Sequence, residues 1–149
     1  MDELALLSAC QIIDLLQKGE VTSLELIDVA ARRIQAVESS INAVPTLCLE
    51  RARERAKTFE RRGCNPAMPL SGLPILVKDN TAVAGVRTTY GSLVYANSVP
   101  AQSDLAVQRL EASGAIVMGK TNTPEFAAGG NTYNEVFGTT YNPWDIRMT

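Results

Sequence analysis

Apolar residues recur at helical spacing in the first 40 positions and predict two helices. The first helix is expected to begin after Ser8 and to end at Gly19, a residue suited to the left-handed conformation of a helix end. Thr22 and Glu25 have the spacing of a capping box, which predicts the start of the second helix. Neither helix carries residues that indicate chemistry, so both are interpreted as structural.

Beyond about residue 42 the pattern changes to strands that alternate with helices. Residues 42–49 are apolar and β-branched, and Pro45 restricts the expected strand to a sheet edge or an irregular course. Residues 50–62 predict a polar helix that Gly63 ends. Its charges favour a solvated surface with Glu/Arg pairs, although a phosphate-binding face stays open.

Two short apolar runs, residues 73–77 and 115–118, predict buried strands. Between them, residues 81–103 predict a long loop, and loops of that length are often functional. A helix is expected from Ser103 and Asp104 to Gly114. The order strand, helix, strand is typical of an α/β fold with a parallel strand pair.

Composition limits the classes of protein to consider. The chain has 149 residues, of which 46% are hydrophobic and 20% charged, which indicates one domain or part of one. Its net charge of −2 gives no field that would attract nucleic acid or an anionic membrane. No apolar run approaches the roughly 20 residues of a membrane span, and the start of the chain does not have the basic character of a signal peptide. We therefore expect a cytoplasmic protein with neither a nucleic-acid nor a membrane partner.

Cysteine and histidine content restricts the chemistry further. Cys10, Cys48 and Cys64 are too widely spaced for a zinc site or a disulfide framework, so they are interpreted as reduced thiols. There is no histidine, which excludes a complete Ser-His-Asp apparatus within this chain. A base must therefore be a carboxylate, a lysine, a tyrosine or a thiolate.

Polar clusters follow both predicted strands, at residues 77–80 and 119–122. In open α/β sheets, sites form beyond the carboxyl ends of strands. Lys78 is expected to be partly buried there, which would lower its pKa and make it a usable base. Asp79 would oppose this effect if it faced the amine, but adjacent strand residues alternate in direction. From position alone, a snorkelling or salt-bridged Lys78 is the stronger interpretation.

Three blocks in this chain resemble the amidase signature family. They are residues 71–80 (SGLPILVKDN), residues 103–126 and residues 137–144 (FGTTYNPW), and their order and spacing also fit the family. The resemblance implies an α/β fold in which helices cover a mixed, twisted sheet. It also implies that residues 1–149 are the N-terminal portion of a single amidase domain, helical over 1–40 and with the α/β core from about 42 onward.

The resemblance implies a hydrolase that cleaves carboxamide C–N bonds through a Ser-cisSer-Lys triad and an acyl-enzyme. Lys78 matches the family's lysine. The family's bridging serine belongs to a glycine- and serine-rich signature, expected just beyond Thr149, and its nucleophilic serine lies further on. The segment that matches the family's acyl pocket is Ala127, Ala128, Gly129 and Gly130, unless these residues only form a loose, glycine-capped helix end. No cofactor and no metal are implied.

Several expectations follow from the missing signature. A second chain or a further C-terminal segment must supply both serines, so this chain alone should be inactive and should expose a sheet edge. The implied substrate is a small-molecule amide. Whether the protein forms a homodimer is left open. Two other interpretations remain: an amidotransferase subunit that releases ammonia from an amide donor, and a truncated, inactive binding or scaffold module.

Some polar residues receive structural interpretations. Lys120 lies in a block that matches a structural part of the family, so it is not taken as a second catalytic lysine. Thr121 and Asn122 could hold the loop at Lys78 by hydrogen bonds. Trp144 is assigned to core or interface packing. Thr123 and Pro124 are expected to begin a helix.

Overall fold

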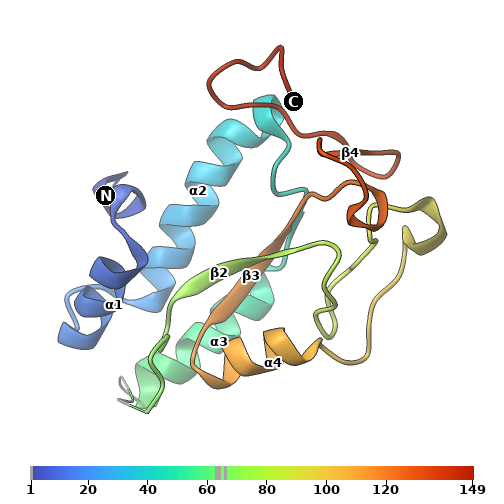
Figure 1. Ribbon diagram of the computed structural model, residues 1–149. Coiled ribbons are helices and arrows are strands. Elements are labelled where there is room, and N and C mark those ends of the chain that lie inside the picture. Colours follow the sequence, from blue (N-terminus) through green and yellow to red (C-terminus); the bar gives the residue numbers. More distant parts are fainter. Residues whose placement is uncertain (1, 63–64, 66) are drawn as a thin grey trace. The chain divides into compact units, whose positions relative to one another are not determined.

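A computed structural model describes residues 2–62, 65 and 67–149 of the chain (Figure 1). Helices and strands alternate as the sequence pattern predicts, which confirms the α/β class. Gly63 and Cys64, one predicted as a helix end and the other as a reduced thiol, lie outside the described residues. The elements are η1 Asp2–Leu6, α1 Ala9–Lys18, α2 Ser23–Ile41, β1 Thr46–Leu47, α3 Leu49–Arg62, β2 Pro74–Lys78, η2 Leu93–Tyr95, α4 Leu105–Ala112, β3 Ile116–Thr121, η3 Glu125–Ala127, β4 Tyr133–Asn134 and β5 Gly138–Thr139.

The two N-terminal helices begin and end where the sequence predicts. Ser8 caps α1 reciprocally with Gln11, and Gly19 ends it with a φ of 70°. At the start of α2, the Glu25 carboxylate accepts from the Thr22 N–H at 2.8 Å, and the Glu25 N–H donates to the Thr22 hydroxyl at 3.2 Å. These contacts form the expected capping box.

The sheet is mixed, with the strand order β1-β3-β2. β1 runs antiparallel to β3, with Thr46 opposite Lys120. β2 and β3 run in the same direction, because the Leu73 carbonyl accepts from Ile116 and the Thr121 carbonyl accepts from Asp79. The predicted parallel pair is therefore present.

β1 is much shorter than the strand expected over residues 42–49. The Val44 N–H donates to the side chain of Glu38, and the Ala43 carbonyl accepts from the Asn122 N–H. The bond to Glu38 takes a backbone N–H that a longer strand would use for pairing, and Thr46–Leu47 is the strand that forms.

Burial differs between the two parallel strands. β3 is buried over Ile116 to Lys120, as predicted. In β2 only Val77 is buried, and Leu76 is 37% exposed. The prediction of a fully buried strand is thus wrong for β2, because this strand lies at an edge of the described sheet.

Three of the six basic residues of α3 are paired with carboxylates. Arg51 contacts Glu111 at 2.7 Å and Arg53 contacts Asp28 at 2.8 Å, both from other elements. Lys57 pairs with Glu54 within the helix. This pairing supports the solvated-helix interpretation over a phosphate-binding face.

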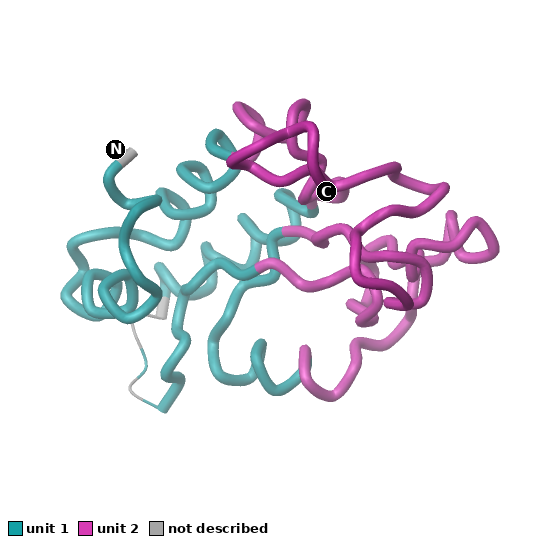
Figure 2. Tube along the Cα trace, turned by 45° about the horizontal axis from the view of Figure 1, so that its top comes forward, with its two compact units in different colours: residues 1–33, 48–75, 108–118 teal, residues 34–47, 76–107, 119–149 magenta. Residues whose placement is uncertain are grey.

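The chain divides into two compact units (Figure 2). One comprises residues 1–33, 48–75 and 108–118, and its α1 and α2 bury Ile12, Leu16, Val21 and Leu26 in a common cluster. The other comprises residues 34–47, 76–107 and 119–149. Every predicted site residue, Lys78 and residues 127–130, belongs to the second unit. No helix of the described part of the chain is both long and apolar enough to span a membrane.

The long loop before α4 is predicted correctly apart from η2. Its backbone is held by bonds from Gly85 to Pro100 and from Thr88 to Ser98. α4 begins directly after Ser103 and Asp104, as expected, and the Ser103 hydroxyl accepts a hydrogen bond from the Ala84 N–H at 2.8 Å. The Asp104 carboxylate likewise accepts from the Ala82 N–H at 2.8 Å.

Candidate active site

Lys78 is the last residue of β2, and its side chain is exposed. Its neighbours Val77 and Asp79 are buried, with 7% and 0% of their surface exposed. Alternation along the strand thus directs Lys78 away from the side that its neighbours occupy. The prediction that Lys78 is partly buried is therefore wrong for the chain as described.

Asp79 is fixed at both its backbone and its side chain. Its N–H donates to the Thr121 carbonyl at 2.9 Å, and its carbonyl accepts from the Tyr90 N–H at 3.1 Å. Its carboxylate accepts from the Thr89 N–H at 3.0 Å and from the Thr89 hydroxyl at 2.5 Å. The partners of Asp79 therefore come from β3 and from the loop after β2.

Lys120, near the end of β3, is fully buried. Its Nζ donates to the Thr81 carbonyl at 2.9 Å and to the Thr88 hydroxyl at 2.7 Å. The same nitrogen lies 3.5 Å from Oδ1 of Asp79. The structural interpretation of Lys120 fits these contacts, but its pairing with Asp79 was not foreseen from the sequence. The signal was present, because parallel strand ends place the polar residues after each strand side by side.

Tyr90 joins the end of β2 to the predicted pocket segment. Its N–H bonds to Asp79, and its carbonyl accepts from the Phe126 N–H at 2.8 Å. The neighbouring Gly91 has a φ of 67°, and a Cβ there would lie only 3.0 Å from the Thr123 carbonyl oxygen. Backbone contacts therefore bring the two loops together within one unit.

The four predicted pocket residues, Ala127, Ala128, Gly129 and Gly130, are all exposed. The preceding Phe126 and Ala127 itself have φ values of 49° and 60°, which non-glycine residues rarely adopt. η3 ends at Ala127 and is followed by Ala128 in an extended conformation, so the glycine-capped helix end is wrong. A helical turn does begin here, but Pro124 and not Thr123 is its N-cap. The glycines instead leave space, since a Cβ on Gly130 would meet nothing within 4 Å.

The Asn122 side chain bonds to the segment after residue 133 rather than to the loop at Lys78. Its amide donates to the Gly138 carbonyl at 3.3 Å and to the Thr140 hydroxyl at 3.0 Å. Its carbonyl oxygen accepts from the amide of Asn134 at 2.7 Å. Thr121 contacts the Lys78 region through the backbone bond from Asp79 that was described above.

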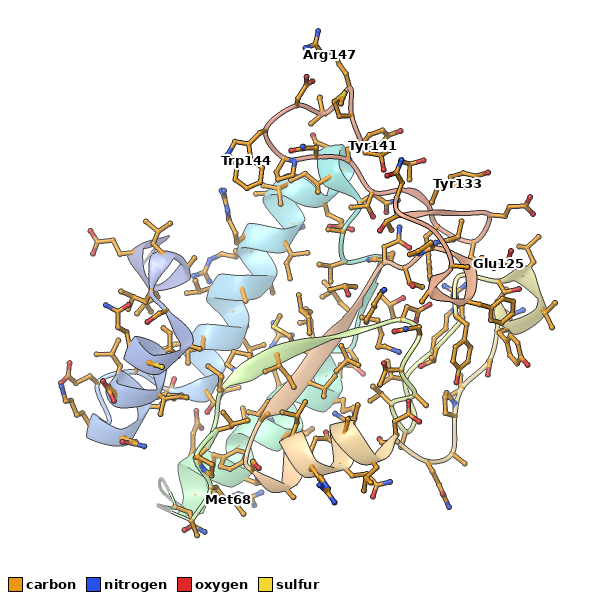
Figure 3. The ribbon with its side chains drawn as sticks, in the orientation of Figure 1. Met68, Glu125, Tyr133, Tyr141, Trp144 and Arg147 are labelled. Carbon is orange, nitrogen blue, oxygen red and sulfur yellow. The ribbon has the colours of Figure 1, made fainter. Side chains whose placement is uncertain are left out.

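Few other side chains in the described residues could take part in a reaction or bind a metal ion. These residues contain no cluster of three His, Cys, Asp or Glu side chains that could hold a metal ion. Cys10 is exposed, and the Cys48 Sγ lies 3.6 Å from the Val117 carbonyl. Trp144, assigned to core or interface packing, is 90% exposed and extends from the C-terminal loop (Figure 3). Lys78 is therefore the basic side chain at the strand ends that is open to a reacting group.

The chain is similar in sequence and in fold to a group of known proteins. The family model described as Amidase matches residues 25–149. The chain is 43% identical over 132 residues to a glutamyl-tRNA(Gln) amidotransferase subunit of Roseiflexus sp. (strain RS-1), covering 88% of this chain and 27% of that protein. It is 41% identical over 141 residues to the corresponding subunit of Heliobacterium modesticaldum, covering 93% of this chain and 29% of the relative.

Solved structures give the same result. The native peptide amidase from Stenotrophomonas maltophilia superposes with a TM-score of 0.87 at 31% identity, covering 98% of this chain and 32% of that one. The 6-aminohexanoate cyclic dimer hydrolase complexed with substrate gives a TM-score of 0.83 at 30% identity, with 94% and 28% covered. The chain thus spans less than a third of the length of these proteins.

Proposed function

Because this chain belongs to the amidase family, we propose that the complete protein hydrolyses a carboxamide C–N bond with Lys78 as the terminal base. The observation that carries the proposal is the placement of Lys78. Its amine is exposed at the carboxyl end of a parallel strand, next to Asp79, whose backbone is held by hydrogen bonds. An amine at that position can contact a substrate or a catalytic group that binds beyond the carboxyl end of the strand.

In the proposed mechanism, Lys78 in its neutral form accepts a proton from a bridging serine. That serine accepts one from the nucleophilic serine, which attacks the amide carbonyl. Backbone N–H groups stabilise the oxyanion, an effect of about 3–4 kcal/mol per donor in comparable sites. Return of the protons expels the amine, and water hydrolyses the acyl-enzyme. Both serines come from sequence beyond Thr149 or from a second chain.

The loop that carries Ala127, Ala128, Gly129 and Gly130 is proposed to line the acyl pocket. Its link to Asp79 through Tyr90 supports this role, because it ties the loop to the strand that bears Lys78. Small side chains and the open space at Gly130 would admit a bulky acyl group.

The amidotransferase alternative has a specific observation in its favour. The two curated relatives described above are amidotransferase subunits at 41–43% identity, whereas the two solved hydrolases are 30–31% identical. The same lysine would then serve ammonia release from an amide donor. Glutamine hydrolysis that depends on added partner subunits would favour this alternative, and turnover of simple amides by the isolated complete protein would favour the hydrolase.

The test of the proposed role is Lys78→Ala in the complete protein. Loss of a general base typically costs about 10²–10⁴-fold, so kcat/KM for amide hydrolysis should fall by that factor. Lys57→Ala is the matched control, because Lys57 is an exposed lysine whose partner is Glu54 on the same helix. Activity near the wild-type level in Lys78→Ala would refute the assignment.

A further inference from the structure

The buried pair of Lys120 and Asp79 lies directly beside the proposed base. Both side chains have no exposed surface, and their charged atoms are 3.5 Å apart. Oδ1 of Asp79 has no hydrogen-bond partner among the described residues, so the nearby ammonium is the group that offsets its charge. A buried charge without compensation is very unfavourable, and each partner therefore needs the other.

Lys120 is poorly suited to accept a proton. Its Nζ already donates to the Thr81 carbonyl and the Thr88 hydroxyl, and the Asp79 carboxylate favours its charged form. Full burial also keeps it away from a substrate. Its contribution must therefore act through another residue.

That residue is Lys78, which shares a peptide bond with Asp79. Asp79 is held by its N–H, its carbonyl and two bonds to its carboxylate. Since the two side chains alternate along the strand, an anchored Asp79 determines the direction in which Lys78 leaves the backbone. A shift of the Asp79 carboxylate would reorient this strand end.

We propose that the Lys120–Asp79 pair is a positioning element for Lys78. It fixes the strand end from which Lys78 projects, because the Lys120 ammonium offsets the buried charge that Asp79 brings to that end. The inference rests on the proposed function insofar as Lys78 is the base of the reaction. It goes further by assigning a role to two residues that do not touch the substrate.

Removal of the Lys120 charge has a measurable consequence. Without the ammonium, the Asp79 carboxylate is buried without compensation, so it takes up a proton or its contacts with Thr89 rearrange. The strand end then no longer holds Lys78 in one direction, and kcat for amide hydrolysis falls. KM should change much less than kcat, because the change reorients the base and not the pocket segment.

The test compares four variants of the complete protein. Lys120→Met removes the charge, and Lys120→Gln removes it but keeps an amide that can donate to Thr81 and Asp79. The double variant Asp79→Asn/Lys120→Met leaves no buried charge. Lys57→Met is the control for loss of a lysine elsewhere. For each variant, kcat and KM for amide hydrolysis are measured separately, and the NMR signal of the Lys78 ¹³Cε is recorded.

We expect both neutral Lys120 variants to lower kcat by about 10²-fold and to shift or broaden the Lys78 signal. The double variant should be less impaired than Lys120→Met, because it strands no carboxylate. Lys57→Met should match the wild type. A purely structural pair would lower the free energy of unfolding and leave kcat and the Lys78 signal of the folded protein unchanged. Should Lys120→Met fail to fold, Lys120→Gln provides the same comparison.

Two results would overturn the inference: a wild-type kcat in the folded neutral Lys120 variants, or an unchanged Lys78 signal in them. The NMR signal requires no turnover, so it tests the inference even if the protein hydrolyses no amide. Failure of the proposed function has a different signature, namely absent hydrolysis in the wild type or full activity in Lys78→Ala.

Discussion

Gly114 joins α4 to β3, and replacing it with alanine should destabilise the chain strongly. Its φ is +100°, a value that L-residues rarely adopt. A Cβ there would lie 2.6 Å from the Cα of Ser71 and 2.8 Å from its nitrogen. The Gly114 carbonyl also accepts from the Gly72 N–H at 3.0 Å, so the turn fixes the approach of the chain to β2.

The magnitude follows from two separate costs. A left-handed alanine costs about 1–2 kcal/mol. Forcing a methyl group against packed backbone adds about 1–3 kcal/mol, because neither Ser71 nor Gly114 can move without disturbing the strands that follow them. Gly114→Ala should therefore lower the free energy of unfolding by about 2–5 kcal/mol.

Gly19→Ala provides the matched control in the same unit. Gly19 also has a positive φ, of 70°, but a Cβ there meets nothing within 4 Å. Gly19→Ala should therefore lower the free energy of unfolding by only about 1–2 kcal/mol. Urea unfolding followed by circular dichroism gives both values. Equal losses in the two variants would refute the steric part of the reasoning, and a neutral Gly114→Ala would refute all of it.

Two further predictions concern the capping box and the pocket segment. The Thr22 N–H and hydroxyl hold the pKa of Glu25 below its usual 4.5, so this contact stabilises the chain above that pH and is lost as the pH falls through the folded-state pKa. Thr22→Ala should lower the free energy of unfolding by about 1 kcal/mol at pH 7. An NMR titration of this variant should find the Glu25 pKa closer to its usual value. An unchanged pKa would contradict the role of the Thr22 hydroxyl. Gly130→Leu enters open space without a positive φ, so in the complete protein it should lower kcat/KM for bulky acyl groups more than for acetyl amides. An unaltered ratio of the two rates would remove this segment from the pocket, and Ala67→Leu, at an exposed position of the other unit, serves as the control.

The sequence predicts local structure well wherever neighbouring residues determine it. The caps at Ser8, Gly19 and Thr22, the extent of α3 and the positive φ at Gly114 all depend on contacts within a few positions. The parallel strands were also predictable, because their apolar runs are short and bounded by polar residues.

Burial was less predictable, because it depends on which strand becomes an edge. β2 and β3 have similar apolar patterns, yet only β3 lies between two partners in the described sheet. The same difference leaves Lys78 exposed, although it was expected to be partly buried, whereas Lys120 is fully buried. The network around Asn122 and Asn134 joins positions that are 12 residues apart through side chains, and no local pattern encodes such a contact.

The contrast between Lys78 and Lys120 also determines how the protein would respond to amine-modifying reagents. An acylating probe needs a neutral, accessible amine, and Lys120 is enclosed and ion-paired with Asp79. Lys78 is open at the strand end, so of these two lysines it is the one that such a probe can reach. A covalent ligand directed at this strand end would thus meet a single target amine, and the internal lysine would remain unmodified as long as the fold persists.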